Sequence, residues 1–420
     1  MEDKISDKCE ARRAFLAHCS PKTRLLHDPV FDPYRACGHP NPSGLGDAAR
    51  FSQTGSWGQS SVLFPTLANY RTADECGRAP YGGAEYGIVQ TPEADAVCKK
   101  IAALHKGYGA VICPSGLSAI ATTLDAFSPK AVLIPDSVYG PMLRFMNRRG
   151  IKQIRYPAGA SADEFRPVLL KARSDYPLCE DLIVYIEAPG SGTFEIPDID
   201  GIIAITQEEN LRTVMDNTWA SHIRFQPLEH GVDIVVQATT KYEGGYGDTP
   251  SGVVVARQPQ DLQRIAGELR ATGNGAVAPT TCSRLYHRID STEERLNQHA
   301  DTAQRLIGWF LKQPFVTGVL SPALETSPYY ERFRRYFGKG NGLFSVVFHS
   351  ERPAVEAFAD ALNLFWVAES WGGHLSLVLP VHAKREVTPL PEGYILRFHA
   401  GLEDHQDLLR DLSQAARVFR

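Results

Sequence analysis

Three runs decide the fold class: LIVYIEA at residues 182–188, LRTVMDNT at 211–218 and DIVVQATTK at 233–241. Each run is short, is rich in Val, Ile and Leu, and ends in polar or turn-forming residues. Segments with helical periodicity lie between them, and further runs of this kind are GAVICPSG at 109–116, AVLIPDS at 131–137 and SGVVVA at 251–256. Short apolar strands separated by helices are typical of a mainly parallel sheet that is covered on both faces. The sequence therefore predicts an α/β domain.

The composition indicates a folded chain without a basic surface. With 420 residues, 43% hydrophobic and 22% charged, the chain is expected to form two or more packed units. Its 44 Lys and Arg against 48 Asp and Glu give a formal net charge of −4, which argues against nucleic acid as a partner. No run approaches the roughly 20 apolar residues that a membrane span requires, and the first residues, MEDKISDKCEARR, lack the apolar stretch of a signal peptide. We therefore expect a cytoplasmic protein without a membrane partner.

The eight cysteines are scattered, without a CxxC pair or a histidine at zinc-ligand spacing. They are Cys9, Cys19, Cys37, Cys76, Cys98, Cys113, Cys179 and Cys282. This pattern predicts free thiols, with no metal site and no disulfide framework.

The chain divides into three stretches. Residues 1–69 are rich in turn-forming residues and are interpreted as an arm that contacts a neighbouring subunit, with a poorly ordered arm as the alternative. Residues 70–285 are expected to form the α/β domain, which would bind the cofactor implied below, and residues 286–420 a smaller α+β domain. A long helix is expected through 280–313, and it could belong to either domain.

Polar residues that directly follow the predicted strands are the first candidates for chemistry, because ligands in such sheets bind beyond the carboxyl ends of the strands. They include Gly116 at the start of a helix, Tyr139, Glu187, Asp216 and Lys241. Taken singly, each has an ordinary structural explanation as a cap, a turn or a solvated side chain. Together they provide what a phosphorylated aromatic aldehyde needs: an amine, a carboxylate for a ring nitrogen, an aromatic face and helix amides for a phosphate.

The stretch 216–248, DNTWASHIRFQPLEHGVDIVVQATTKYEGGYGD, resembles the cofactor-lysine region of the Cys/Met-metabolism family of pyridoxal-phosphate (PLP) enzymes, in particular the cystathionine beta-lyases. Similar motifs follow one another along the chain: YGIVQTP at 86–92, CPSGLSAI at 113–120, IEAPGSGTFEIPDI at 186–199, GLFSVVF at 342–348, ESWGGHLSL at 369–377 and LRFHAGLED at 396–404. The resemblance implies a PLP-dependent transferase fold of the aspartate aminotransferase-like type, fold type I. It also implies pyridoxal 5'-phosphate as the cofactor.

The resemblance also implies roles for residues at the cofactor. Lys241 would form the Schiff base and later move protons on the substrate, Asp216 would pair with the pyridinium nitrogen, and Tyr139 would stack on the ring and assist catalysis. The groups implied to bind the phosphate are the amides of Gly116 and Leu117 and the hydroxyl of Thr240.

Substrate-binding roles follow from the same resemblance. Arg397 would bind the substrate carboxylate, while Glu369, Ser370 and Trp371 would line the pocket. Tyr86 would reach the phosphate and the leaving group from the adjacent subunit, as a catalytic and cofactor-binding residue. A homodimer or homotetramer with shared active sites is therefore expected.

The sequence departs from the family pattern in two places. The family has an arginine two residues after the tyrosine matched by Tyr86, where this chain has Ile88, so a cationic phosphate ligand is absent from its expected place. In addition, Glu369 is typical of enzymes that act at the γ-carbon, whereas Trp371 is typical of beta-lyases.

The function that these observations predict is a PLP-dependent carbon–sulfur lyase that performs β-elimination on a sulfur-containing amino acid and releases pyruvate, ammonia and a thiol. The alternative is γ-elimination or γ-replacement of the cystathionine gamma-synthase or gamma-lyase type, in specialised metabolism. A third hypothesis, supported only by the missing arginine, is a binding or regulatory protein that kept the fold and lost the cofactor.

Overall fold

The computed structural model describes residues 67–68, 71, 90–273 and 275–419. Its larger sheet has seven strands in the order β1-β7-β6-β5-β4-β2-β3. The strands are β1 (Gly109–Cys113), β2 (Ala131–Pro135), β3 (Lys152–Tyr156), β4 (Leu182–Glu187), β5 (Arg212–Asp216), β6 (Ile234–Gln237) and β7 (Gly252–Ala256). Only β7 pairs antiparallel, with both of its neighbours. The predicted mainly parallel α/β sheet is confirmed.

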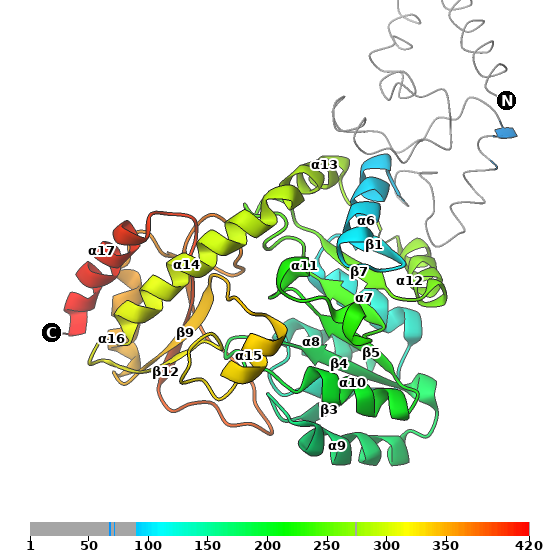
Figure 1. The fold of residues 1–420 in the computed structure, drawn as a ribbon, viewed down its shortest axis with the longest axis horizontal. Coiled ribbons are helices and arrows are strands. Elements are labelled where there is room, and N and C mark those ends of the chain that lie inside the picture. The colour runs from blue at the N-terminus through cyan, green and yellow to red at the C-terminus, as the bar shows by residue number, and fades with distance from the viewer. Residues whose placement is uncertain (1–66, 69–70, 72–89, 274, 420) are drawn as a thin grey trace, which may run out of the picture.

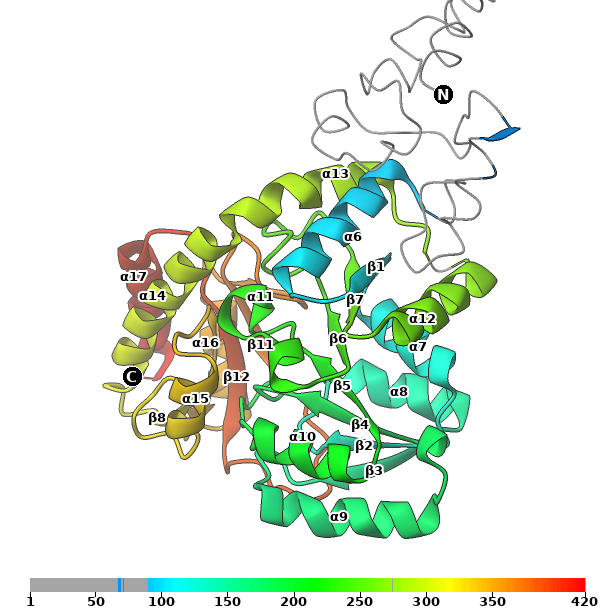
Figure 2. The same cartoon turned by 45° about the vertical axis from the view of Figure 1, so that its right-hand side comes forward.

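Helices cover both faces of this sheet (Figure 2). On one face lie α7 (Gly116–Phe127), α8 (Gly140–Arg149) and α12 (Pro259–Thr272), and on the other lie α9 (Ala162–Asp175) and α10 (Ile199–Glu208). Strand β4 shows why both faces are covered, because Val184 and Ile186 belong to one core and Ile183 and Tyr185 to the other. A strand that is apolar on both sides is stable only between two helical layers.

Near the β1 edge of the sheet, α6 (Pro92–Leu104) packs against β1, β7 and α13 (Pro279–Arg288). Its start is defined by Thr91, whose hydroxyl accepts the N–H of Ala94 at 3.2 Å, and by Pro92 at the first helical position. The remaining short elements of the domain are η2 (Cys179–Asp181), α11 (Ser221–Arg224) and η3 (Pro227–His230).

The two sheets are joined by α13 (Pro279–Arg288), η4 (Ile289–Ser291) and α14 (Thr292–Phe310), which run one after another across the molecule (Figure 1). The sequence predicted one long helix through 280–313. The structure instead interrupts it at 289–291, where the 3-10 turn η4 stands between two α-helices.

The smaller sheet has five strands in the order β10-β11-β12-β9-β8. The strands are β8 (Val316–Leu320), β9 (Leu343–Phe348), β10 (Trp366–Val367), β11 (Leu377–Pro380) and β12 (Tyr394–His399), and the helices are α15 (Tyr330–Tyr336), α16 (Arg352–Asp360), α17 (His405–Ala415) and the 3-10 turn η5 (Ala416–Phe419). Its core is aromatic and includes Phe344, Phe348 and Phe398. This is the predicted smaller C-terminal α+β unit. The arm predicted for residues 1–69 lies outside the described residues except for 67–68.

Candidate active site

The Lys241 side chain lies where the two units meet. Its Nζ donates a hydrogen bond of 2.6 Å to Ser370 Oγ and lies 5.0 Å from the centre of the Trp371 ring. Burial and the charge of Arg397 lower the pKa of Lys241 to about 8, although Asp216 and other acidic charge oppose that shift. An amine with this pKa is partly uncharged near neutral pH, which is what a Schiff-base lysine requires.

The loop that carries Ser370 is held against Lys241 from several sides. Ser370 has a left-handed backbone, with φ of 76°, and its carbonyl accepts Arg397 Nη2 at 2.9 Å. Gly372 also has a positive φ, and a Cβ atom there would lie 2.9 Å from the carbonyl carbon of Lys241. The N–H of Gly372 donates to His399 Nε2 at 3.1 Å. The close approach to Lys241 therefore depends on glycine at 372 and on two side chains of β12.

Asp216 ends β5 and points its carboxylate towards the same region. The N–H of Thr218 donates to Oδ1 at 2.9 Å and the Tyr185 hydroxyl donates to Oδ2 at 3.3 Å. Burial raises the pKa of Asp216, while these hydrogen bonds and the charge of Lys241 oppose the rise. A protonated ring nitrogen beside Asp216 would further favour its ionised form.

Tyr139 offers an aromatic face at this site. It stands at the cap position before α8, and 40% of its surface is exposed. Burial raises the pKa of its hydroxyl, and the negative charges of Asp216, Glu187 and Glu369 raise it further. A ring in this position is available to stack on a planar ligand.

The start of α7 provides unpaired backbone amides. Gly116 and Leu117 are its first two residues, and Ser115 caps the helix by accepting the N–H of Ser118 at 3.0 Å. The first N–H groups of a helix have no partner within the helix and favour anions. A Cβ atom at Gly116 would lie 2.5 Å from the Cβ of Ala238, so only glycine lets these amides lie so close to the Lys241 segment.

The other two predicted phosphate ligands are Thr240, whose hydroxyl already has partners within the protein, and Tyr86, which lies outside the described residues. The Thr240 hydroxyl donates to the Ser251 carbonyl and accepts the Ser251 N–H, both at 2.9 Å. Its proton is thus already used within the protein, and binding a phosphate would require exchanging that bond. Tyr86 and Ile88 lie outside the described residues.

The structure therefore brings together every predicted site residue that it describes. These residues come from both units of the structure and are as far as 281 positions apart in the sequence, the distance from Gly116 to Arg397. They provide the amine, the carboxylate, the aromatic face, the helix amides and the arginine. This set of donors fits a phosphorylated aromatic aldehyde: glycine opens the cradle for its phosphate, and the lysine has the lowered pKa that Schiff-base formation needs.

Three further residues support this site, and of these the sequence indicated only Glu187, as a strand-end candidate without a specific role. Tyr185 binds Asp216, His399 binds the loop at Gly372, and Glu187 accepts the N–H of Tyr139 at 2.7 Å. A signal was present, because alternate strand residues share a face of a sheet. Tyr185 stands two residues before Glu187, and His399 stands two residues after Arg397.

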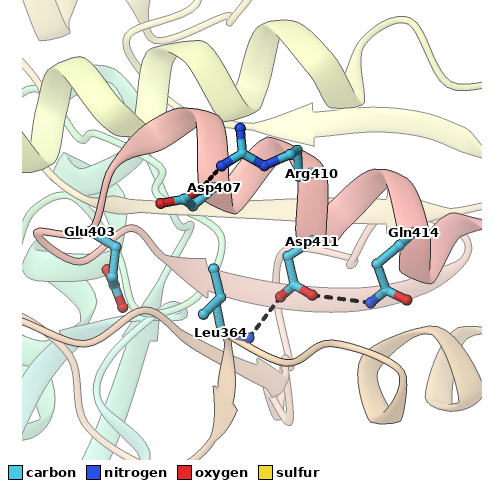
Figure 3. A pocket seen from close by; sticks show the side chains of 6 residues that line it. All are labelled: Leu364, Glu403, Asp407, Arg410, Asp411 and Gln414. Atoms are coloured by element: carbon cyan, nitrogen blue, oxygen red, sulfur yellow. Dashed lines mark hydrogen bonds and ion pairs between the residues drawn. The ribbon is translucent and has the colours of Figure 1, made fainter.

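A surface hollow at α17 does not belong to this site (Figure 3). It is lined by Leu364, Glu403, Asp407, Arg410, Asp411 and Gln414. Its polar groups are already paired, since Asp411 accepts the N–H of Leu364 at 2.8 Å and the side chain of Gln414 at 3.0 Å, and Arg410 pairs with Asp407. We assign no ligand to it.

Within the part of the chain that the structure describes, no group of three or more His, Cys, Asp or Glu side chains is arranged to hold a metal ion. Cys98, Cys113, Cys179 and Cys282 are free thiols. Among the described helices, none has both the length and the apolar character needed to cross a bilayer.

Comparison with known proteins gives a consistent result. Cystathionine beta-lyase MetC of Escherichia coli is 31% identical over 369 residues, which are 84% of this chain and 90% of that protein. The L-alanine/L-glutamate racemase of Wolbachia pipientis is 29% identical over 372 residues, 85% and 90% of the two chains. The crystal structure of cystathionine gamma synthase from Xanthomonas oryzae, in complex with cystathionine, has the same fold, with a TM-score of 0.76, 24% identity and coverage of 90% of this chain and 98% of that one. Residues 53–417 match one sequence family, so this chain belongs to the Cys/Met metabolism PLP-dependent enzyme family, and pyridoxal 5'-phosphate is its cofactor.

Proposed function

We propose that this protein is a carbon–sulfur lyase that performs β-elimination on a sulfur-containing amino acid, as cystathionine beta-lyases do, and releases pyruvate, ammonia and a thiol. The observation that carries β-elimination is the Trp371 ring 5.0 Å from the Lys241 amine, because the family resemblance makes tryptophan at this position typical of beta-lyases. Ser370 lies between that amine and the Arg397 guanidinium. An amino acid whose carboxylate binds Arg397 would therefore present its α-carbon near the Lys241 amine.

The residues from the larger sheet would hold the cofactor. Lys241 would bind its aldehyde, Asp216 would hold the proton on its ring nitrogen, and the Tyr139 ring would lie against its face. The amides of Gly116 and Leu117 would bind its phosphate. When bound, pyridoxal phosphate supplies an electron sink for the electron pair released at the substrate α-carbon.

The residues from the smaller unit would hold the substrate. Arg397 keeps N–H groups beyond the one bonded to Ser370, and its planar guanidinium can bind a carboxylate through two parallel hydrogen bonds. Lys241 Nζ, released to the substrate's side, would take the proton from the α-carbon and later return one to the leaving sulfur. Trp371 lies beside that amine and would limit the space for the substrate side chain.

The assignment of Lys241 can be tested directly. Borohydride reduction of the holoenzyme, followed by digestion and mass spectrometry, should find the pyridoxyl group on the Lys241 peptide. The group on another lysine would refute the site. The family membership already argues against the hypothesis of a protein that lost its cofactor.

The reaction itself is tested with L-cystathionine and identification of the keto acid. β-Elimination gives pyruvate, whereas 2-oxobutyrate, or no keto acid, counts against it. Because a relative is a racemase, the same holoenzyme should be given L-alanine and L-glutamate, and their D-isomers should be sought by chiral chromatography. Lys241→Ala serves as the inactive control for each reaction.

Glu369 favours a second candidate function, γ-elimination or γ-replacement. Its carboxylate acts on the pKa values of Lys241, Tyr139 and Arg397, which places a negative charge at the centre of the site. A carboxylate there could accept a proton from a substrate carbon beyond the α-position. The test is an activated homoserine ester with a thiol: a new thioether amino acid would support γ-replacement, and its absence would refute it.

The oligomer and the location are part of the same proposal. We infer a cytoplasmic homodimer or homotetramer in which Tyr86 of one subunit completes the site of another. Mixing Tyr86→Phe and Lys241→Ala variants, each impaired alone, should restore activity through hybrid sites if the sites are shared.

A further inference from the structure

Glu187 is a buried carboxyl group for which the proposed chemistry has no role. It ends β4 and is the register partner of Asp216 on β5, with only 7% of its surface exposed. Its two oxygens have different partners: Oε2 accepts the N–H of Tyr139 at 2.7 Å, and Oε1 accepts the Ser191 hydroxyl at 2.6 Å. The side chain therefore bridges the segment after β4 and the segment that carries Tyr139.

The two bridged segments also make direct backbone contact. The N–H of Ser191 donates to the carbonyl of Ser137 at 2.9 Å. A Cβ atom at Gly190 would lie 2.3 Å from Ser137 Oγ, so the chains approach as closely as glycine allows. Two hydrogen bonds thus hold residues 136–139 to the end of β4 and the segment after it, and the bond to Glu187 is the one made by Tyr139 itself.

Among the described residues, few contacts fix the position of the Tyr139 ring. It is 40% exposed, and within the described residues its hydroxyl makes no hydrogen bond that would fix it. An exposed ring takes its position mainly from its own backbone, and that backbone bonds to Glu187.

We propose that Glu187 is a positioning residue that acts through Tyr139: by binding the Tyr139 N–H and the Ser191 hydroxyl, it fixes where the aromatic face lies relative to Asp216 and Lys241. The proposal rests on the cofactor placement described under the proposed function and is independent of whether the reaction is β- or γ-elimination. Glu187 itself touches neither cofactor nor substrate in this scheme.

The charge state of Glu187 agrees with such a role. Burial and the neighbouring Asp216 carboxylate raise the pKa of Glu187 to about 8, against the opposing effects of Ser191, the Tyr139 N–H and Arg385. The titratable groups that face it are Asp216 on β5, Arg385 in the segment between β11 and β12, and the hydroxyls of Tyr139, Tyr156 and Tyr185. A neutral carboxyl group keeps an oxygen for the Tyr139 N–H and leaves Asp216 as the only carboxylate of the pair to face the ring nitrogen. Glutamine has the same shape as this neutral form.

The test is a double-mutant cycle on cofactor affinity, measured by titrating apoenzyme with pyridoxal phosphate. Tyr139→Ala and Glu187→Ala should each raise the dissociation constant about tenfold, the size expected for losing one ring contact or one buried hydrogen bond. In the Tyr139→Ala background, Glu187→Ala should add less than about twofold, because no ring remains to be positioned. Glu187→Gln should stay within about threefold of the wild type and keep its visible circular dichroism band.

Controls separate this effect from general damage. Glu208→Gln, the same change at an exposed ion pair at the end of α10, should leave the affinity unchanged. If Glu187→Ala does not fold, Ser191→Ala loosens the other end of the bridge and should show a smaller effect that also disappears without the ring. Equal effects of Glu187→Ala in both backgrounds, or an effect of Glu187→Gln as large as that of Glu187→Ala, would overturn the proposal. Unchanged affinity in Tyr139→Ala would overturn the ring placement as well, so the two failures are distinct.

Discussion

Asp136 links the two units, and its removal should destabilise both the fold and the site. The carboxylate accepts three backbone N–H groups of residues 386–388, the shortest at 2.7 Å from Thr388, and pairs with Arg155 at 2.9 Å. The side chain of Asp136 is fully buried, and that of Arg155 is only 7% exposed. Residues 386–388 lie in the segment that leads into β12, which carries Arg397, and Asp136 stands three residues before Tyr139.

Asp136→Ala should lower the free energy of unfolding by about 3 to 5 kcal/mol, because it leaves three backbone N–H groups without their acceptor and removes the buried carboxylate that pairs with Arg155, which keeps only the exposed Glu386 at 3.3 Å. Asp181→Ala breaks an ion pair whose partner, Lys130, is 63% exposed, and should cost less than about 1 kcal/mol. Urea denaturation at pH 7 measures both, and kcat/KM should fall in the Asp136 variant because the Arg397 strand loses its anchor. A loss below about 1 kcal/mol in Asp136→Ala would refute the reasoning.

The same comparison has a defined pH dependence. Burial acts to raise the pKa of Asp136, but the N–H groups of 386–388 and Arg155 outweigh it, and the pKa lies below its ordinary value. The stabilisation is therefore complete above about pH 4, the pKa of an unfolded aspartate, and is lost as the pH falls towards the lower pKa of the folded state. The difference between wild type and Asp136→Ala should shrink over that acidic range. A difference that stays constant there would show that the charge of Asp136 is not what stabilises the contact.

Three further predictions concern the site. Gly116→Ala should weaken pyridoxal phosphate binding at least about tenfold, because the new Cβ would lie 2.5 Å from the Cβ of Ala238. Gly140→Ala, where a Cβ meets nothing within 4 Å, should leave the affinity unchanged. Titration of both apoenzymes measures this, and equal affinities would contradict a phosphate site at the start of α7. Lys241 of the apoenzyme should react with an amine reagent with a midpoint at about pH 8, against about 10.4 for an ordinary lysine, because burial disfavours its charged form. Peptide mass spectrometry after labelling at a series of pH values measures the midpoint, and an ordinary value would count against a buried amine. His399→Leu should raise KM more than it lowers kcat, because the loop beside Lys241 loses the hydrogen bond from the Gly372 N–H to His399. Steady-state kinetics measure both constants, and an unchanged KM would exclude a role of His399 in placing this loop.

The larger sheet could be predicted because its strands carry an unambiguous signal. β4 is buried along its whole length, and short runs of Val, Ile and Leu separated by helical segments are typical of a parallel sheet that is covered on both faces. β3 was not predicted, because Lys152–Tyr156 is a partly exposed edge strand that contains charged and polar residues. In its sequence pattern, such a run cannot be distinguished from a loop. The break at Ile289–Ser291 was also missed, because the helical pattern continues through it.

From the sequence one could predict which described residues of the candidate site lie near one another, but not the contacts between them. Asp216 ends β5, and Lys241 lies four residues after the end of the neighbouring strand β6, so the topology brings both residues to one edge of the sheet. The bond from Lys241 to Ser370 joins residues 129 positions apart and depends on a left-handed backbone at Ser370, which no local pattern indicates. The role of Glu187 was hidden for another reason: its partner is a backbone N–H, and every residue except proline has one.

The division of the site between the two units bears on the open choice between β- and γ-chemistry. Residues that would hold the cofactor come from the strand ends of the larger sheet, whereas Glu369, Ser370, Trp371 and Arg397 come from the smaller unit. Both candidate reactions need the same cofactor placement and the same α-proton transfer, so they can differ only in what surrounds the substrate side chain. The loop at 369–371 provides both a carboxylate and an indole ring there, next to the amine that would move the protons. We therefore expect Glu369→Ala to change the ratio of pyruvate to 2-oxobutyrate formed from L-cystathionine while leaving cofactor affinity unchanged. An unchanged ratio would place the choice of bond outside this loop.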